Sequence, residues 1–476
     1  MTNSKLITLL KTFDKLEWRR LGEFLASPFF NKNQELLNFY GYLKKITPDF
    51  SEKKLTKERV FKKIYPNQPF QARMIEDLMY SLLKQSENFL RLLQLEQNEY
   101  VSNLLILDGL IERKLEKHYR IYKKESAKIL ESNVGSSSDR LLFQYQLANL
   151  ATKHFNAQNQ RVNNPNQQLS LDLLDQFYFF NKLKASCEML VNKDIVAEDF
   201  RLDFTQEVAT YLAEKKEPLE PIIHLYLIAY QIGTDEKSDD YFTQLVKLLD
   251  EYDLTIPASE KKTLYLFAIN YCVLQMKQNN QVEWYVNQCL DLYLKGIQQK
   301  FLYQNGYLSP WTFKNVVKLG FNLKKYDWTA NFIDQHHTQL REEFQSDAYH
   351  YNLADLNYRR ANYEAAQIHL MQVKFSDIFY NLGAKTMLIK LYFETGEEEA
   401  LLSMIASFTI YLKRNKQIAN NFRETYLNFT SLLFQLLKAK AHKLPLVMEK
   451  ISQAEPLTDR RWLLKVGETL QKAQRR

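Results

Sequence analysis

Glycine and proline are unusually scarce in this chain. Each occurs 11 times in 476 residues, against usual shares of about 7% and 5%. Sheets and long loops depend on turns, and turns draw heavily on these two residues. The scarcity therefore favours helices joined by short connections. Hydrophobic residues make up 45% of the chain and charged residues 25%, so it can bury a core. Its length predicts several units or an extended helical repeat.

Cysteine is scarcer still. Only Cys187, Cys272 and Cys289 occur, without any CxxC pair, which argues against a disulfide framework or a zinc site. The N-terminus lacks the features of a secretory signal. The most apolar run, residues 221–230, is interrupted by His224 and is too short to span a bilayer. We therefore expect a cytoplasmic protein without a membrane span.

The common catalytic fingerprints are also missing. The sequence has no GxSxG, HExxH, GxxxxGK[ST] or GxGxxG motif, the marks of hydrolases, zinc proteases, P-loop proteins and dinucleotide-binding enzymes. His336 and His337 are adjacent, so on a helix they point about 100° apart and share no ligand face. We expect no enzymatic activity, no cofactor and no metal. An enzyme whose chemistry follows none of these motifs is the remaining alternative.

Charge is distributed unevenly along the chain. The net charge is +8, and residues 1–130 carry 24 basic and 16 acidic side chains. Residues 131–437 carry 30 basic and 36 acidic side chains, and residues 438–476 carry 10 and 4. Both ends are basic and the middle is mildly acidic. This pattern either attracts acidic partners to the ends or reflects ordinary solvated helix faces.

Hydrophobic residues recur near a 3.6-residue period, which predicts helices along most of the chain. The first predicted helix covers residues 4–26, and another helical stretch covers 100–130. The Ser-rich segment 131–139 then interrupts the pattern with polar, flexible chain. We predict an all-α protein with a basic N-terminal helical module over 1–130 and an α-α solenoid of stacked antiparallel helix pairs over 140–476.

Start signals and breaks refine this organisation. Ser170 is expected to cap a helix over 171–191, and Ser309-Pro310 to begin another, because serine accepts from free amides and proline needs no amide partner. From about residue 219 onward, alternate breaks between helices fall 35 to 46 residues apart. Helix pairs with such a period are typical of solenoids, in which stacked neighbours share a continuous core.

The clearest repeat unit lies in residues 350–378. Asn352-Leu353-Ala354 and, at the turn between the helices, Ala361-Asn362-Tyr363 are followed by the small residue Ala366. This unit resembles a tetratricopeptide repeat, which has Asn-Leu-Gly, Gly-Asp/Asn-Tyr and a small residue at these places. The resemblance extends over about 310–412, although the family's closing proline is absent. It implies a helical-repeat scaffold for protein–protein interaction.

The resemblance also implies where a partner binds, because the first helix of each pair lines the inner surface of such stacks. Lysine and asparagine at this surface resemble the face with which some family members hold peptide C-termini, whereas Asp355 departs from that pattern. The alternative is a merely solvated face. The candidate peptide groove comprises Lys314, Lys318, Asn322, Tyr351, Asp355, Tyr358, Arg359, Lys390 and Phe393.

A second candidate surface lies near the N-terminus. Predicted helices over 56–64 and 70–90 flank a proline-containing turn and suggest a helix-turn-helix that contacts nucleic acid, although the second helix carries apolar residues typical of a buried element. The candidate basic patch comprises Lys53, Lys54, Lys57, Arg59, Lys62 and Lys63. At the other end, residues 459–476 predict an amphipathic capping helix.

Two functions follow from these patterns. The first is a non-catalytic scaffold or adaptor that binds another protein or a peptide, whose identity the sequence does not give. The alternative is a regulator whose basic N-terminal module touches nucleic acid while the repeats sense a partner.

Overall fold

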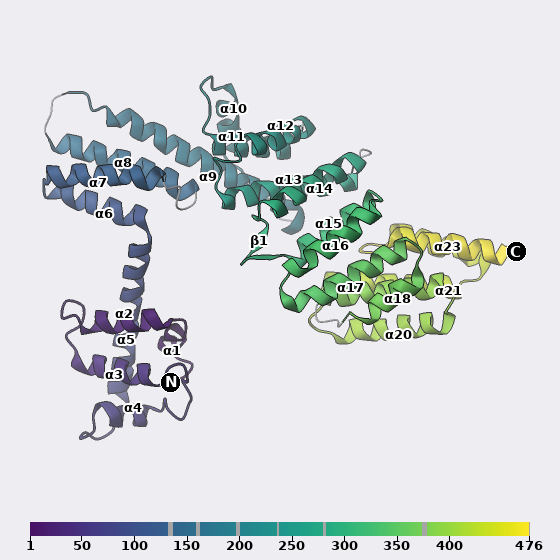
Figure 1. The fold of residues 1–476 in the computed structure, drawn as a ribbon, viewed down its shortest axis with the longest axis horizontal. Helices are drawn as coiled ribbons and strands as arrows, with labels where there is room; N and C mark the ends of the chain where they lie inside the picture. Colours follow the sequence, from purple (N-terminus) through teal and green to yellow (C-terminus); the bar gives the residue numbers. More distant parts are fainter. Residues whose placement is uncertain are drawn as a thin grey trace. The chain divides into compact units, whose positions relative to one another are not determined.

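The computed structural model shows an all-α protein with 78% helix, in which each helix packs mainly on its neighbours in the chain. It describes residues 1–131, 137–158, 162–196, 200–235, 238–278, 282–373 and 378–475. The predicted all-α fold with sequentially packed helices is confirmed (Figure 1).

The chain divides into two compact units, Met1–Lys182 and Leu183–Arg476, here called unit 1 and unit 2. Their division falls inside one long helix, Asn166–Val196. The module boundary predicted around 131–139 lies largely outside the described residues and stays a prediction.

Unit 1 consists of helices that bury one side each. Leu21, Phe39 and Ile75 are fully buried in one apolar cluster built from its first five helices. The helices are α1 (Lys5–Leu10), α2 (Lys15–Ala26), α3 (Gln34–Lys45), α4 (Lys57–Ile64), α5 (Ala72–Gln97), α6 (Glu99–Glu112), α7 (Glu116–Glu131), α8 (Ser137–Ala157) and the first part of α9 (Asn166–Val196).

Two helices predicted as continuous are broken in unit 1. The prediction over 4–26 is wrong at Asp14, whose carboxylate accepts from the Glu17 amide at 2.7 Å while the Glu17 carboxylate accepts from the Asp14 amide at 2.8 Å. This reciprocal capping box starts a new helix. The stretch over 100–130 is broken at Lys114, which has a positive φ of 58°, a conformation that helices do not continue through.

The predicted cap at Ser170 is also wrong. Ser170 lies inside α9 and is buried, and its hydroxyl donates to the Asn149 side chain at 2.6 Å. The helix begins earlier, where the Asn164 side chain accepts from the Asn166 amide at 3.0 Å. Asparagine is as good a capping residue as serine, so Asn164 provides the start signal that was assigned to Ser170.

Unit 2 holds the rest of α9 and the helices that follow. A short antiparallel hairpin, β1 (Tyr303–Gln304) with β2 (Tyr307–Leu308), interrupts them. The helices are α10 (Thr205–Glu214), α11 (Pro221–Thr234), α12 (Ser238–Glu251), α13 (Ala258–Gln278), α14 (Val282–Gln298), α15 (Pro310–Asn322), α16 (Tyr326–His336), η1 (His337–Gln339), α17 (Glu342–Arg359), α18 (Tyr363–Met371), α19 (Ile378–Glu394), α20 (Glu398–Arg414), α21 (Asn420–Lys438), η2 (Ala441–Lys443), α22 (Leu444–Gln453) and α23 (Arg460–Arg475).

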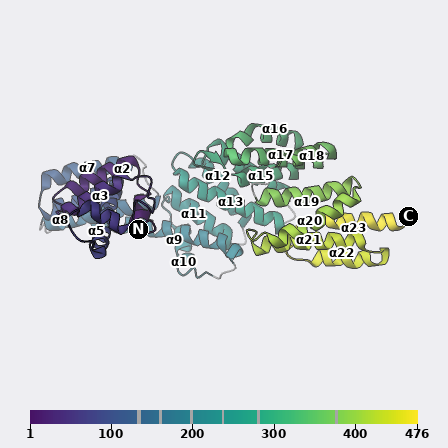
Figure 2. The same cartoon turned by 90° about the horizontal axis from the view of Figure 1, so that it is seen from below.

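Helices of unit 2 pack in consecutive pairs. α11 packs on α12, α13 on α14, α15 on α16, α17 on α18 and α19 on α20, and α15, α17 and α19 also contact one another in that order (Figures 1 and 2). The last of these pairs, α19 with α20, shares an apolar cluster with α21, α22 and α23. This is the pairwise arrangement that the repeat period predicts, because one pair alone leaves an apolar face uncovered.

Small residues allow the helices of a pair to approach. Ala366, at the predicted small position of α18, is fully buried. In the preceding pair Thr329 takes this place, and a Cβ on Gly320 of α15 would lie only 2.3 Å from its hydroxyl oxygen. Gly320 therefore compensates for the larger side chain, since no other residue leaves that space free.

The start of α15 follows the predicted signal. Ser309 accepts from the Trp311 amide at 3.3 Å, and Pro310 occupies the first helical position. The hairpin just before it was not predicted, although Asn305 and Gly306 at its tip both have positive φ and Asn-Gly is a strong hairpin signal.

An ion pair is buried between α9 and α13 inside unit 2. Glu260 is only 1% exposed, and both of its carboxylate oxygens accept from the Lys184 ammonium, at 2.8 and 3.0 Å. The Tyr226 hydroxyl of α11 donates to the same carboxylate at 2.6 Å. Because buried charges are costly unless paired and hydrogen-bonded, this cluster fixes how three helices meet.

Candidate functional site

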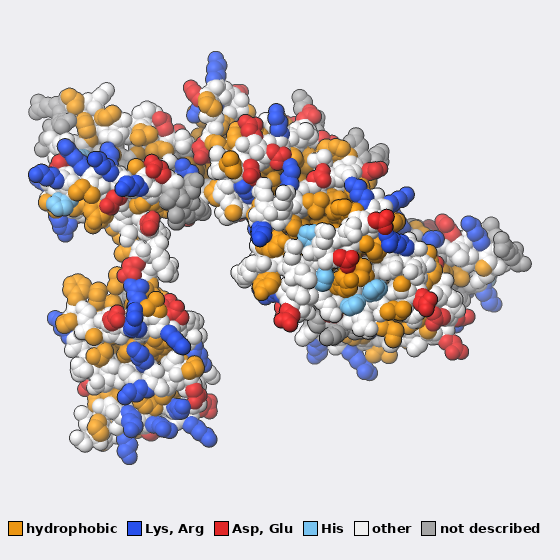
Figure 3. All heavy atoms as spheres, in the orientation of Figure 1, with side chains coloured by type: hydrophobic (Ala, Val, Ile, Leu, Met, Phe, Trp, Pro, Cys, Tyr) orange, Lys and Arg blue, Asp and Glu red, His pale blue; other side chains and the backbone are white. Residues whose placement is uncertain are grey.

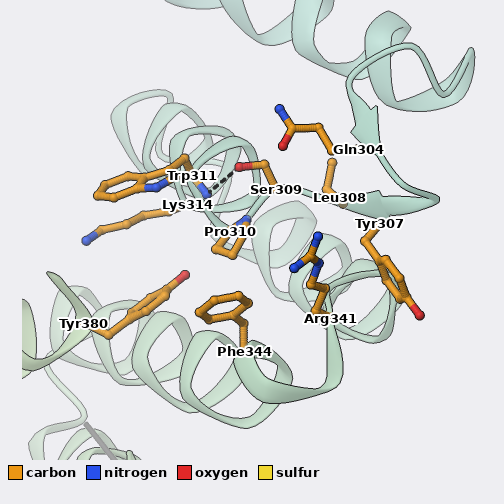
Figure 4. A pocket seen from close by; sticks show the side chains of 10 residues that line it. All are labelled: Gln304, Tyr307, Leu308, Ser309, Pro310, Trp311, Lys314, Arg341, Phe344 and Tyr380. Carbon is orange, nitrogen blue, oxygen red and sulfur yellow. Dashed lines mark hydrogen bonds between the residues drawn. The ribbon is translucent and has the colours of Figure 1, made fainter. Parts of the chain in front are cut away.

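A pocket opens beside the first helices of the repeat pairs in unit 2. Its volume is about 270 Å³. The hairpin, the beginnings of α15 and α17, and one residue of α19 contribute its walls (Figure 4). The lining residues are Gln304, Tyr307, Leu308, Ser309, Pro310, Trp311, Lys314, Arg341, Phe344 and Tyr380.

The lining is cationic and aromatic. Lys314 and Arg341 bring two positive charges, and none of the ten lining residues is acidic. Two helices begin here, α15 after Ser309 and α17 after Arg341, and helix N-termini carry partial positive charge. Glu342 and Glu343 occupy the first turn of α17 but do not line the pocket. The pocket thus favours an anionic group.

Lys314 lies against aromatic rings. Its ammonium is 5.0 Å from the ring centroid of Tyr351 and 5.3 Å from that of Tyr380, within the range of a cation–π interaction. The two rings meet edge to face at 5.3 Å. Gly383 of α19 makes room for this arrangement, since a Cβ there would lie 2.6 Å from the Tyr351 hydroxyl. Lys314 is therefore held at the pocket wall.

Several lining side chains remain accessible at the rim. Trp311 is 50% exposed and Tyr307 is 46% exposed, while Arg341 is exposed and makes no ion pair with any described carboxylate. In Figure 4, Trp311 and Lys314 extend from α15 in the same direction, and the Tyr380 hydroxyl points toward the middle of the lining. An aromatic group that enters the pocket can therefore stack on exposed rings.

The structure distributes the predicted groove residues over three helices. Lys318 and Asn322 are exposed on α15. On α17, the Arg359 guanidinium pairs with Asp355 at 2.8 Å and lies 4.6 Å from the Phe321 ring. Asp355 is thus matched by a cation on its own helix, so its negative charge is compensated.

The remaining predicted groove residues meet the chain's own C-terminal segment. Lys390 pairs with Asp459, and its ammonium is 5.8 Å from the Trp462 ring. Phe393 meets Trp462 edge to face at 5.6 Å. The Tyr358 hydroxyl and the Trp462 indole both donate to one Glu394 oxygen, at 3.3 and 3.2 Å. This end of the predicted groove is therefore filled from within unit 2.

Burial changes the acidity of the tyrosines along these helices. Burial, followed by the charge of Asp355, raises the pKa of Tyr351 well above its usual value. Burial, followed by the charge of Glu394, likewise raises the pKa of Tyr358. Burial and then Asp459 raise the pKa of Tyr426 to about 12. All three hydroxyls stay protonated near neutral pH, so each is able to donate a hydrogen bond.

In the predicted basic patch of unit 1, three of the six cations have partners. Lys54 pairs with Asp49 at 2.9 Å and Lys57 with Glu76 at 2.5 Å. Arg59 donates to the Lys53 carbonyl at 3.1 Å. Lys and Arg side chains, coloured blue, gather over the part of unit 1 that holds α4 (Figure 3).

Lys62 and Lys63 differ from the other members of the patch. Both are exposed in the last turn of α4, where cations interact favourably with the helix C-terminus. The Lys53 side chain is also exposed. The patch thus consists of three exposed lysines, Lys53, Lys62 and Lys63, beside three cations that have partners, Lys54, Lys57 and Arg59.

A histidine pair joins α17 to α18. The Nδ1 atoms of His350 and His369 are 3.1 Å apart, so one ring donates and the other accepts. Burial, with the charge of His369 next, lowers the pKa of His350, and burial lowers the pKa of His369. His336 and His337, the predicted adjacent pair, each contact a backbone carbonyl of α16.

Within the described residues, no group of three or more histidine, cysteine or acidic side chains is arranged to hold a metal ion. Burial raises the pKa of the Cys187, Cys272 and Cys289 thiols. Across the same residues, no helix combines the length and apolar character needed to cross a bilayer.

Sequence reasoning did not find most of the pocket. Of its lining residues, only Lys314 belongs to the predicted groove, and Trp311, Arg341, Phe344 and Tyr380 were missed. The Asn305-Gly306 hairpin signal marks one wall, but no local pattern indicates that residue 380 lies beside residue 311.

Compared with family models, curated proteins and solved structures, the chain matches none of them. The structure itself defines an all-α protein of sequentially packed helices, compatible with a helical solenoid. Its unit 2 carries a cationic, aromatic pocket on the first helices of consecutive pairs.

Proposed function

We propose that this chain is a non-catalytic helical-repeat scaffold or adaptor that binds a peptide segment of another protein through the pocket of unit 2. The tetratricopeptide-like pattern over about 310–412 supports this proposal, because such pairs expose their first helices to partners. The observation that carries it is the lining: two cations, four aromatic rings and no acid around about 270 Å³. Peptide sites combine apolar pockets with a few polar anchors in this way.

The α19 end of the predicted groove, which residues of the C-terminal segment fill, supports the same proposal. Lys390 and Phe393 hold a carboxylate and an indole there, which are groups that a peptide also presents. The exposed guanidinium of Arg341 and the exposed ring of Tyr307 offer groups of the same kinds where the pocket remains open. Binding would add contacts to a surface that is already organised, so little ordering is required of the protein.

The test is an unbiased selection from a random peptide display library on the full-length chain. We expect enriched peptides whose binding falls at least tenfold in Trp311→Ala. Ile410→Ala is the matched control, because Ile410 of α20 is also 50% exposed and lies outside the pocket lining. A selection that enriches no peptide, or peptides that bind Trp311→Ala as well as the unchanged chain, would refute the proposed function.

A further inference from the structure

Positive charge is concentrated on helix α7 of unit 1 and on the turn before it. Residues 113–131 contain seven Lys and Arg side chains against three glutamates, and all seven cations are exposed. In Figure 3, blue side chains run over the part of unit 1 where Figure 1 places α7. These cations, together with Ile121, are here called the α7 surface. The cations are Arg113, Lys114, Lys117, Arg120, Lys123, Lys124 and Lys128.

The inner side of α7 is attached to the core of unit 1. Tyr119 is buried, and its ring stacks on the His154 imidazole of α8 with 3.9 Å between ring centroids. The hydroxyl of the buried Ser126 donates to the Asn103 side chain of α6 at 2.6 Å. The helix is therefore held in place by its neighbours in the chain, so binding of a partner to its outer side requires little ordering.

The outer side of α7 carries a line of lysines with one isoleucine among them. Its members follow one another at intervals of four, three and four residues, a spacing that places side chains on one face of a helix. At 3.6 residues per turn this face lies opposite the buried one, and it extends over about 16 Å. The members of this line are Lys117, Ile121, Lys124 and Lys128, all of them exposed.

The arginines and the lysines of the α7 surface differ in what they already bind. The Arg113 guanidinium donates to the Gly109 carbonyl at 2.9 Å, and the Arg120 guanidinium pairs with Glu116 at 2.6 Å. None of the five lysines forms an ion pair with a carboxylate of the described residues. The charges left for a partner are therefore mainly the compact, strongly hydrated ammonium groups of lysine.

We propose that the α7 surface binds the surface of a lipid bilayer that contains anionic phospholipid. Clusters of about four to eight Lys and Arg on a helix are typical of binding to anionic headgroups. A bilayer is flat and its lipids diffuse laterally, so that headgroups can gather beneath every lysine of a straight line. Ile121, 55% exposed within this line, enters the boundary between headgroups and acyl chains. The α7 surface belongs to unit 1, so this binding does not depend on the peptide pocket of unit 2.

Nucleic acid is the competing partner for a basic helix, and two features favour the bilayer. Arginine is the residue best suited to hold phosphates and to recognise nucleic acid, but both arginines of the α7 surface are engaged within the chain. An exposed isoleucine between lysines gains nothing from a phosphate backbone, whereas at a bilayer its apolar surface leaves water. The combination of unpaired lysines and an exposed aliphatic side chain therefore fits a lipid surface better.

The probe is a vesicle made of equal parts phosphatidylcholine and phosphatidylserine, and vesicles of phosphatidylcholine alone are the neutral comparison. Co-sedimentation of the full-length chain with vesicles at low ionic strength measures the binding. We expect binding to the anionic vesicles and none to the neutral ones. Binding should weaken as salt is raised, because exposed charges are screened.

A triple variant, Lys117→Gln/Lys124→Gln/Lys128→Gln, removes the charges of the line. A lysine near an anionic bilayer contributes about fivefold in affinity, so we expect binding to the anionic vesicles to fall at least tenfold. The matched control removes three exposed lysines of α1, α2 and α3 in the same unit and should lower binding less than threefold. This control is Lys5→Gln/Lys15→Gln/Lys45→Gln.

The variant Ile121→Gln tests the apolar contact separately from charge, and it should weaken binding to the anionic vesicles at least threefold. Circular dichroism checks that each variant is folded. No binding to the anionic vesicles, equal losses in the triple variant and its control, or no effect of Ile121→Gln would overturn the inference. Binding of duplex DNA that the triple variant loses, without binding of vesicles, would assign the α7 surface to nucleic acid and overturn it as well.

Discussion

Lys184→Met provides a quantitative test of the packing in unit 2. In the unchanged chain the Glu260 carboxylate is 1% exposed and accepts from the Lys184 ammonium and from the Tyr226 hydroxyl. Methionine keeps most of the side-chain volume but removes the cation. The carboxylate is then left buried with one neutral donor, and breaking a buried pair in this way costs about 3–5 kcal/mol.

The lower part of that range applies here, because the Lys184 side chain is 25% exposed and water can partly replace it. About 3 kcal/mol corresponds to roughly a hundredfold change in the unfolding equilibrium. The double variant Lys184→Met/Glu260→Gln should recover about half of this loss, since the amide is neutral and still accepts from the Tyr226 hydroxyl.

Urea unfolding followed by tryptophan fluorescence measures the effect. Four of the five tryptophans, at positions 284, 311, 328 and 462, lie in unit 2, so the signal reports mainly on that unit. A loss under about 1 kcal/mol for Lys184→Met, or a double variant as unstable as the single one, would show that Glu260 is not held as a buried, paired carboxylate.

Further predictions concern the repeat pairs and the N-terminal module. Ala366→Leu should cost about 1–3 kcal/mol in urea unfolding through overpacking, and an unchanged midpoint would contradict the close approach of α17 and α18. Burial lowers the pKa of His350 and His369 in the folded chain, so their contribution to stability is present above the unfolded-state pKa and is lost as pH falls below that value. The variant His350→Phe should therefore lose less stability than the unchanged chain between pH 7 and 5. An identical dependence of stability on pH in the two proteins would contradict this role of the histidine pair. Lys62→Glu with Lys63→Glu should abolish any salt-sensitive binding to duplex DNA, and a titration of the unchanged chain without binding at low salt rules out the nucleic-acid alternative.

The arrangement of helix pairs could be predicted from the sequence because short local patterns determine where its helices begin and pack. Periodic apolar residues, the Ser309-Pro310 start and the small residue at position 366 each act within one or two turns of helix, and the structure shows the corresponding start and the fully buried alanine. Breaks at Asp14 and Lys114 were missed because the apolar period continues through them, while capping and a left-handed residue end the helices.

The pocket could not be predicted from local sequence patterns. Trp311, Arg341 and Tyr380 belong to three helices, and only the packing of consecutive pairs brings them together. The predicted groove residues Lys390 and Phe393 were correctly placed on one helix, α19, but their contacts come from Asp459 and Trp462 far along the chain. No local pattern contains such pairings, since they depend on where the last helices fold back.

Site-specific photo-crosslinking tests the central claim most directly. A benzophenone amino acid at position 307 replaces one aromatic rim residue, 46% exposed, by another, and the same group at position 410 serves as the control. With a display-selected peptide, we predict a crosslink from position 307 that excess unlabelled peptide suppresses, and none from position 410. Equal crosslinking from both positions, or none from position 307 with a peptide that binds, would contradict a peptide site in this pocket.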